Sequence, residues 1–330
     1  MRAYAIRRLI LIVPTLIMVT VLVFLLVRFI PGDALDQMVL EMSQYTEWGA
    51  ELNVDILKKQ LGLDQPIHIQ YGRWAGFLPG DDGSFSGVLQ FNLGDSLWKN
   101  APVTQLIAER LPVTMELGIL TIIFALLVAF PVGIYSAIRQ DTTIDYIGRS
   151  IAILMMSVPN FWLATMLFVY PSIWWQWTPS IKYIPFLNDP LANLGMFIVP
   201  AILMGAAMAG TLMRMIRTMM LEVLRQDYIR TAWSKGLNER TVIIRHALKN
   251  AFIPIITMIG PMSVLLISGT VVMEQIFCLP GMGKLMLDAL NSRDYPIISG
   301  LNLVTATVVM FVYLAVDLSY AWLDPRIRYQ

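Results

Sequence analysis

The sequence predicts an all-α membrane protein with six transmembrane helices, and three observations lead to this fold class. Of the 330 residues, 57% are hydrophobic and only 14% are charged, and the mean hydropathy of the chain is +0.64. The apolar residues gather in six runs without a charged side chain, each close to or above the roughly 20 residues that cross a bilayer as a helix. Lysine and arginine concentrate in alternate connections between these runs, as they do on one side of a multi-pass protein.

Each of the six uncharged runs is interpreted as one span. In chain order they are Leu9–Val27, Leu117–Ile138, Ser150–Ile181, Pro190–Met213, Asn250–Met273 and Tyr295–Val316. The first run follows a basic start and lacks a clear cleavage site, so it is expected to be a retained signal-anchor helix. The third run is long enough to include a loop on the aqueous side. Proline residues lie inside or near several spans, which lipid tolerates when neighbouring helices satisfy the freed backbone groups.

Residues 31–112 form a long insert between the first two spans that is too polar to lie in lipid. It contains two helix-like stretches, "VDILKKQLGL" and "APVTQLIAERL". Because ordinary connections measure roughly 4–6 residues, the insert is expected to be ordered and external. Residues 1–112 are therefore interpreted as an N-terminal span with its insert, and residues 113–330 as a five-helix core. A shorter segment, residues 274–294, holds an apolar piece that cannot span and is expected to dip into the membrane edge or to cap a cavity.

The distribution of basic residues predicts how the spans are oriented. Eight lysine and arginine residues lie between Arg214 and Lys249, and others occur before the first span, after the second and in the tail. All of these segments fall on one face of a six-span protein. The N-terminus, the C-terminus and the segment between the fourth and fifth spans are therefore expected to be cytoplasmic, in a multi-pass membrane protein.

The usual signatures of catalysis and ion coupling are missing from the sequence. It has no phosphate-binding loop of the G-x-x-x-x-G-K-[ST] type and no H-E-x-x-H motif. The two histidines, His68 and His246, are distant in sequence, and Cys278 is the single cysteine. No catalytic residue, cofactor, metal site or nucleic-acid partner is therefore expected, and an intramembrane enzyme is the least favoured class because no nucleophile–base pair lies in the spans.

Charged residues are expected only at the ends of the spans, and not at their centres. Those next to the runs are Arg28, Glu116, Asp189, Glu274 and Asp317. A carrier driven by protons or sodium keeps ionisable groups within its spans. If the chain moves a solute uphill, the energy is therefore expected to come from a partner.

One segment of the chain, Tyr228–Pro254, is unusually basic. It has a single acid, Glu239, among the basic residues Arg230, Lys235, Arg240, Arg245 and Lys249, with His246 as a possible further cation. Apolar side chains recur at helical spacing from Met219 to Lys235. Gly236 is expected to end that helix in the left-handed conformation, with Leu237 supplying the hydrophobic contact of the cap.

A second helix is expected directly after this turn. Asn238 is a good N-cap, and the apolar stripe that leads into the fifth span consists of Ile243, Ile244, Ala247, Leu248 and Ala251. Two interpretations of the helix–turn–helix stay open from the residues alone. In the first, it is a compact projection that docks into a groove of a soluble protein. In the second, it is a basic juxtamembrane helix attracted to anionic lipid.

Together these residues resemble a known family. "YIRTAWSKGL" (228–237) and "RHALKNAFIP" (245–254) are similar to the E-A-A…G loop of ABC-importer membrane subunits, in the oligopeptide/dipeptide/nickel permease branch. Arg230 stands where the wider superfamily has glutamate. The likeness covers nearly the whole chain through "LGLDQPIHIQY" (61–71), "NLGDS" (92–96), "LPVTMELG" (111–118), "SVPNFWLA" (157–164), "EQIFCLPGMGKLMLDAL" (274–290), "RDYPIISG" (293–300) and "LDPRIRY" (323–329).

The resemblance implies a permease subunit that forms half of a translocation pathway in the lipid bilayer. Its implied partners are a second homologous permease subunit in a heterodimer, two cytoplasmic ATPase subunits and an external solute-binding protein, which the insert would help to receive. ATP hydrolysis belongs to the ATPases, so this chain is not expected to be an enzyme. Its basic segment would be the coupling helix, with the ATPase contacts Tyr228, Arg230, Thr231, Ala232, Trp233, Lys235, Gly236 and Leu237.

The substrate implied by the resemblance is a dipeptide, an oligopeptide or a similar small solute. Oligosaccharides, opines and nickel complexes are alternatives within the same importer class. A stand-alone channel or secondary carrier is the contrasting class, and transport by the chain alone without ATP would distinguish it from an importer subunit.

Overall fold

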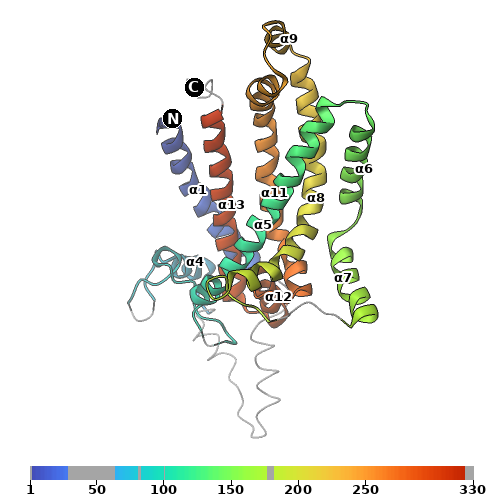
Figure 1. Cartoon of the computed structure of the whole chain (residues 1–330). Helices are drawn as coiled ribbons and strands as arrows, with labels where there is room; N and C mark the ends of the chain where they lie inside the picture. The colour runs from blue at the N-terminus through green and yellow to red at the C-terminus, as the bar shows by residue number, and fades with distance from the viewer. Residues whose placement is uncertain (1, 29–63, 81–82, 100, 177–181, 324–330) are drawn as a thin grey trace. The chain divides into compact units, whose positions relative to one another are not determined.

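Helices make up nearly all of the described chain in the computed structural model, which describes residues 2–28, 64–80, 83–99, 101–176 and 182–323 (Figure 1). The long helices are α1 (Arg2–Arg28), α5 (Val103–Ile138), α8 (Pro190–Leu224), α11 (Lys249–Ile276) and α13 (Tyr295–Leu323). The shorter ones are α4 (Ile67–Ala75), η1 (Val88–Gln90), α6 (Thr143–Ser157), α7 (Asn160–Trp175), α9 (Asp227–Ser234), α10 (Glu239–Thr241), the π-helix η2 (Val242–Leu248) and α12 (Met282–Ser292). Because no strand occurs in these ranges, the all-α prediction is confirmed.

Five helical stretches of the described chain are long and apolar enough to cross a membrane. They are Ile6–Leu26, Val103–Ile138, Pro190–Leu224, Glu239–Val264 and Tyr295–Ser319. A sixth candidate is the pair α6 and α7, which is bent by 84° at a short break. This pair replaces the single span predicted from the third uncharged run. The break falls at Val158–Pro159, where Val158 is extended, as the residue before a proline tends to be.

Several helices extend beyond the predicted spans, and α5 and α8 do so by the greatest lengths. The stretch predicted as a separate helix of the insert, "APVTQLIAERL", is the beginning of α5, which passes through Pro112 without ending. The predicted boundary between residues 112 and 113 therefore lies inside one helix, and the division into domains stays a prediction. Helix α8 continues past Met213 to Leu224 because its buried stripe continues through Ile216 and Met220.

The chain forms two compact units. The first, the core unit, consists of residues 1–8, 112–284 and 309–330, and the second, the insert unit, of residues 9–111 and 285–308. The hydrophobic core of the core unit gathers buried residues of α5, α6, α7, α8, α9, the π-helix and α11, with Phe197, Leu117, Leu212 and Ile216 among the largest.

Small residues let α5, α6 and α8 approach closely in the core unit, as they do at interfaces between membrane helices. A Cβ atom on Gly210 of α8 would lie 2.5 Å from the carbonyl oxygen of Ala152 in α6. A Cβ atom on Gly148 of α6 would lie 2.5 Å from the Ser136 hydroxyl oxygen in α5. Neither contact leaves room for a larger side chain, so these glycines set the spacing of the three helices.

A fully buried carboxylate joins α5 and α11 to the start of α12. Glu274 has no exposed surface, and its Oε1 accepts a 2.7 Å hydrogen bond from the Thr114 hydroxyl. Its Oε2 accepts from the Lys284 backbone N–H at 2.9 Å. The Thr114 hydroxyl oxygen in turn accepts from the Met282 backbone N–H at 2.8 Å. Glu274 lies at the end of its helix, as the sequence indicates, but the sequence did not predict that its carboxylate would be buried.

The insert unit has its own packing, and residues 29–63, 81–82 and 100 of this part of the chain lie outside the described residues. Gly87 sits so close to the end of α4 that a Cβ atom would lie 2.5 Å from the Gly76 backbone nitrogen. The Ser96 hydroxyl donates a short hydrogen bond of 2.5 Å to buried Asp294, just before α13. The described part of the insert is therefore folded, while the predicted helix-like stretch "VDILKKQLGL" lies outside the described residues.

Replacement of Gly210 with alanine should lower the free energy of unfolding by about 1–3 kcal/mol, because the added methyl group has to push α6 and α8 apart. Gly195, also in α8, has nothing within 4 Å of the position that a Cβ atom would take, so Gly195→Ala is the matched control and should leave stability unchanged or slightly higher. Thermal unfolding of the purified protein in detergent, followed by tryptophan fluorescence, measures both. Equal melting temperatures for the two variants would contradict this packing.

Candidate functional site

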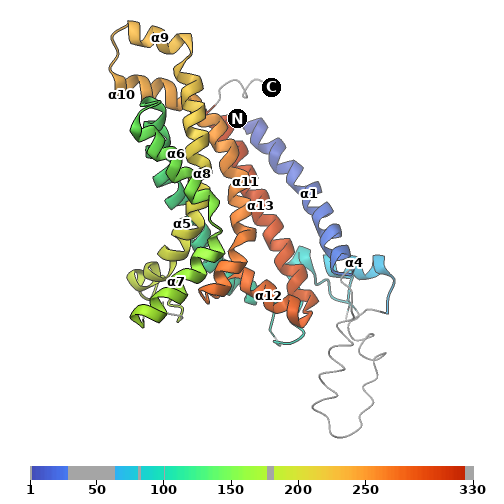
Figure 2. The same cartoon turned by 90° about the vertical axis from the view of Figure 1, so that its right-hand side faces the viewer.

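The basic segment between α8 and α11 forms a projection of its own at one end of the core unit. Figure 2 shows α9 beyond the end of α8, with α10 and the π-helix leading back to α11. The predicted single helix from Met219 to Lys235 is wrong, because α8 ends at Leu224 and α9 begins at Asp227. Gln226 between them is extended, with φ −74° and ψ 149°. Periodicity alone predicts continuation, but packing of the apolar face decides where a helix turns.

Helix α9 has one buried face and one exposed face. Ile229 and Ala232 are buried against the core of the core unit. Of the predicted contact residues, Ala232 therefore packs inside its own chain, and its small size serves that packing. The others are on the exposed side of the segment, namely Tyr228, Arg230, Thr231, Trp233, Lys235, Gly236 and Leu237.

Polar contacts hold the exposed face only loosely. The Tyr228 hydroxyl accepts a hydrogen bond of 2.9 Å from the Asn250 side-chain amide, which ties α9 to α11. Arg230 and Asp227 form an ion pair with 3.7 Å between nitrogen and oxygen, and both side chains are more than three-quarters exposed. Pairs of this kind contribute about 0–1 kcal/mol. The guanidinium of Arg230 is therefore accessible to a partner at little cost.

The turn after α9 is built as predicted. Gly236 has φ +76°, its N–H donates to the Trp233 carbonyl at 2.9 Å, and the Leu237 N–H donates to the Ala232 carbonyl at 3.4 Å. This pair of bonds is the Schellman arrangement that closes a helix at a left-handed residue. Asn238 then caps the following helix, since its side-chain oxygen accepts from the Thr241 N–H at 2.9 Å.

The helix after the turn departs from the prediction in its winding. Residues Val242–Leu248 form a π-helix, which has a wider turn than an α-helix and is frequent at functional sites. The expected apolar stripe is accordingly changed: Ile243, Ala247 and Ala251 are buried, but Ile244 is about half exposed. No feature of the local sequence indicated the π-helix.

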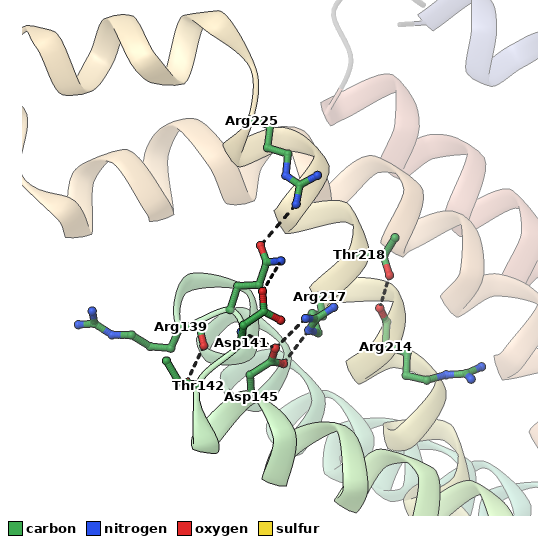
Figure 3. A network of polar contacts seen from close by, with 9 residues as sticks. Arg139, Asp141, Thr142, Asp145, Arg214, Arg217, Thr218 and Arg225 are labelled. Carbon is green, nitrogen blue, oxygen red and sulfur yellow. Dashed lines mark hydrogen bonds and ion pairs between the residues drawn. The ribbon is translucent and has the colours of Figure 1, made fainter.

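An ion pair that the sequence did not predict lies between α6 and α8 (Figure 3). The Arg217 guanidinium donates to both oxygens of Asp145, from Nε and from Nη2, at 2.7 Å each. Asp145 has no exposed surface, and its Oδ2 also accepts from the Asp141 N–H at 3.0 Å. The only signal in the sequence is the position of Arg217 next to the apolar stripe of Ile216 and Met220, because a charge that is buried there needs a partner.

Comparison with known proteins shows the class to which this arrangement belongs. The sequence profile described as "Binding-protein-dependent transport system inner membrane component" matches residues 129–329. The companion profile "Binding-prot-dependent transport system membrane comp, N-term" matches residues 1–118. A solved structure of the MetNI methionine ABC transporter in an inward facing conformation contains a chain of similar fold, with a TM-score of 0.52 and 13% identity. The match covers 67% of this chain and 97% of that one.

Curated relatives match over the full length. A Brucella abortus protein that carries the name of a peptide transport system permease protein is 38% identical, and 100% of both chains is covered. The dipeptide transport system permease protein DppB of Escherichia coli is 37% identical with the same coverage. DppB of Alkalihalophilus pseudofirmus is 35% identical over 100% of both chains.

These matches define a membrane component of a binding-protein-dependent transport system, with a fold similar to that of an ABC-transporter chain. The chain belongs to the family of binding-protein-dependent transport system inner membrane components, and it is a multi-pass inner-membrane protein. The family resemblance stated from the sequence motifs is confirmed.

Replacement of Gly236 with valine should destabilise the turn by more than ~1 kcal/mol, because a β-branched residue disfavours the left-handed conformation. Hydrogen exchange at the Gly236 and Leu237 amides, followed by mass spectrometry, should then be at least about fivefold faster in the segment 232–238. Gly83 offers a matched control with φ +77° and the same free space around it. Gly83→Val should leave exchange in this segment unchanged, and protection that survives in Gly236→Val would contradict the assigned turn.

Proposed function

We propose that this chain is one permease subunit of an ATP-driven importer and forms half of its translocation pathway. A second, homologous permease subunit completes the pathway as a heterodimer. Two cytoplasmic ATPases supply the energy, and an external binding protein delivers the solute. The chain itself hydrolyses no ATP in this proposal. Membership of the family of binding-protein-dependent inner membrane components supports the ATPase and binding-protein partners. The pairing of two different permease subunits is an additional part of the proposal.

The observation that carries the proposal is the shape of the segment from Asp227 to Leu237. It is a short helix seated on its own chain by Ile229 and Ala232 and closed by the Gly236 turn. Its outward face presents two aromatic residues, Tyr228 and Trp233, each a little under half exposed. An aromatic and basic surface on a rigid helix is suited to a groove in a protein. Lipid attraction alone requires no such defined turn.

The orientation follows from charge. Arg139, Arg149 and the eight basic residues between Arg214 and Lys249 belong to the side that carries the coupling segment. In the proposal this side and both chain termini are cytoplasmic, since short connections rich in lysine and arginine stay on that side. The segment from Asp227 to Leu237 is then on the side of the membrane where cytoplasmic ATPases can contact it.

The proposed solute is a dipeptide or oligopeptide. Support comes from the relatives named as dipeptide and peptide permeases, at 35–38% identity over the full length. Oligosaccharides, opines and nickel complexes remain the competing solutes in this importer class. Equilibrium binding of each to the purified binding protein distinguishes them, and tight binding of a sugar without peptide affinity would refute the peptide assignment.

The coupling role is tested in proteoliposomes that contain this chain with its second permease subunit, its ATPases and the binding protein. Wild type should take up a labelled dipeptide only with ATP on the side of the membrane that holds the ATPases. The Gly236→Val variant should insert into the membrane normally. It should lose most of its ATPase co-purification and uptake, because α9 and its turn are then misplaced. Uptake by this chain alone, without ATP, would instead make it a channel or carrier.

A second variant separates docking from lipid attraction. If the segment is only a lipid anchor, Gly236→Val should be mild, and replacement of Arg240, Arg245 and Lys249 with glutamine should be severe, because each basic residue near an anionic surface contributes about 1 kcal/mol. Docking predicts the reverse order. Full ATPase binding and transport in Gly236→Val would defeat the coupling assignment.

The insert is proposed to help receive the binding protein on the external side. Its described part presents large apolar side chains to solvent at Phe77, Phe85, Leu89 and Phe91, and Phe91 is 87% exposed. Gly87 packs against α4 between them, so the loop that carries these side chains is fixed on a folded base. Exposed apolar clusters on such a base mark interaction sites.

Replacement of Phe85, Leu89 and Phe91 with serine should weaken association of the binding protein by about tenfold or more, because exposed aromatic anchors contribute about 1–2 kcal/mol or more each when buried by a partner. Surface plasmon resonance on the importer in nanodiscs measures this affinity. ATPase co-purification is the internal control and should not change. Deletion of residues 82–96 should impair docking or assembly more severely, and full transport after that deletion would contradict the role of the insert.

A further inference from the structure

The ion pair between Asp145 and Arg217 lies at the end of the core unit from which α9 projects. Arg217 is seven residues before the end of α8, about 10 Å along the helix axis at 1.5 Å per residue. No glycine or proline occurs between Arg217 and Leu224, and sharp helix kinks arise almost always at such residues. The end of α8 is therefore a stiff lever between the ion pair and α9.

The pair is built to hold two helices in one fixed relation. Both nitrogen–oxygen contacts measure 2.7 Å, and a bidentate guanidinium–carboxylate pair restricts rotation as well as distance. The Asp145 side chain is fully buried and that of Arg217 is 19% exposed, so water cannot replace either partner easily. Seven residues earlier in α8, the close contact of Gly210 with the Ala152 carbonyl of α6 fixes the distance between the same two helices.

Asp145 also fixes the turn that joins α5 to α6. Asp141 in this turn has φ +61°, a left-handed conformation that is unusual for a residue other than glycine. Its N–H donates to Asp145 Oδ2, and Gln140 next to it accepts a long hydrogen bond of 3.5 Å from Arg225, at the end of α8. Figure 3 shows Asp141, Asp145 and Arg217 converging in this network, with Arg225 above them. One carboxylate thus connects three elements, namely the turn, α6 and α8.

We propose that Asp145 and Arg217 are positioning residues through which a displacement of the coupling helix α9 is passed from α8 to α6 and the α5–α6 turn. This inference rests on the proposed function, because it assumes that α9 is moved by an ATPase. The role of the pair is to keep α6 and α8 moving as one body, so that motion at α9 changes the arrangement of the spans and is not absorbed at the α6–α8 contact.

The pair predicts a specific failure when it is broken. Asp145→Asn keeps the size of the side chain but removes its charge, and its NH₂ group cannot accept from Arg217. Helix α9 keeps its own seat on Ile229 and Ala232 and its Gly236 turn. The ATPases should therefore still bind and hydrolyse ATP within about twofold of wild type, but dipeptide taken up per ATP should fall roughly 5- to 150-fold, the usual range of coupling between sites.

The experiment uses the complete importer in proteoliposomes and measures uptake of a labelled dipeptide and ATP hydrolysis in the same sample. Asp145→Glu restores the charge and should recover part of the lost ratio. Asp317→Asn is the control, since it removes a different ion pair of the core unit, with Arg8 at 2.8 Å, and should leave the ratio of uptake to hydrolysis unchanged. If Asp145→Asn fails to assemble, Arg217→Lys takes its place, because it keeps the charge but loses the bidentate geometry.

The outcomes separate the possibilities. A lower ratio of uptake to hydrolysis in an intact complex supports the proposal. An unchanged ratio overturns it, as does a parallel fall of both rates with lower complex stability, which indicates a structural role only. Failure of the proposed function is seen independently, because wild type would then show no ATP-dependent uptake.

Discussion

Three carboxylates taken out of water determine where helices of this chain meet. Asp145, Glu274 and Asp294 are buried almost completely, and each accepts hydrogen bonds from residues of its own unit. In a bilayer the chain has few other ways to satisfy such groups, and for Asp145, whose partner is charged, loss of Arg217 would cost about 3–5 kcal/mol. Each carboxylate therefore admits one arrangement of its neighbours: α6 on α8, α11 on α5 and the start of α12, and the insert on the start of α13.

The sequence predicted the spans and the turn well because these depend on local properties. The length of an uncharged run determines a span, and a left-handed backbone position favours glycine, as at Gly236. The cap at Asn238 requires only that its side-chain oxygen accept from the Thr241 N–H, three residues on. The break at Gln226, the bend between α6 and α7 and the π-helix depend on what lies next to the chain in space. Asp145 was missed for the same reason, since its partner Arg217 is 72 positions away.

The core unit combines fixed and adaptable parts. Gly148 and Gly210 bring α6 close to α5 and α8, and the Asp145 pair closes the same bundle at its end. Helix α9 is attached differently, through buried Ile229 and Ala232, through the Tyr228 hydroxyl and through the π-helix that leads back to α11. In the proposed importer, α9 would be displaced by the ATPase, and the rigidly packed helices α6 and α8 would transmit that displacement to the other spans.

The way α9 is seated also bears on how such a subunit can change its partner over evolutionary time. Its fold is secured from the inside, by Ile229, Ala232 and the conformation of Gly236. Apart from Tyr228, whose hydroxyl binds Asn250, the outward side chains such as Arg230 and Trp233 contribute little to this packing and can be exchanged without unfolding the helix. If α9 is the ATPase contact, as proposed, the subunit could be matched to a different ATPase by substitutions on one face of these eight residues, without changes to the membrane-spanning helices.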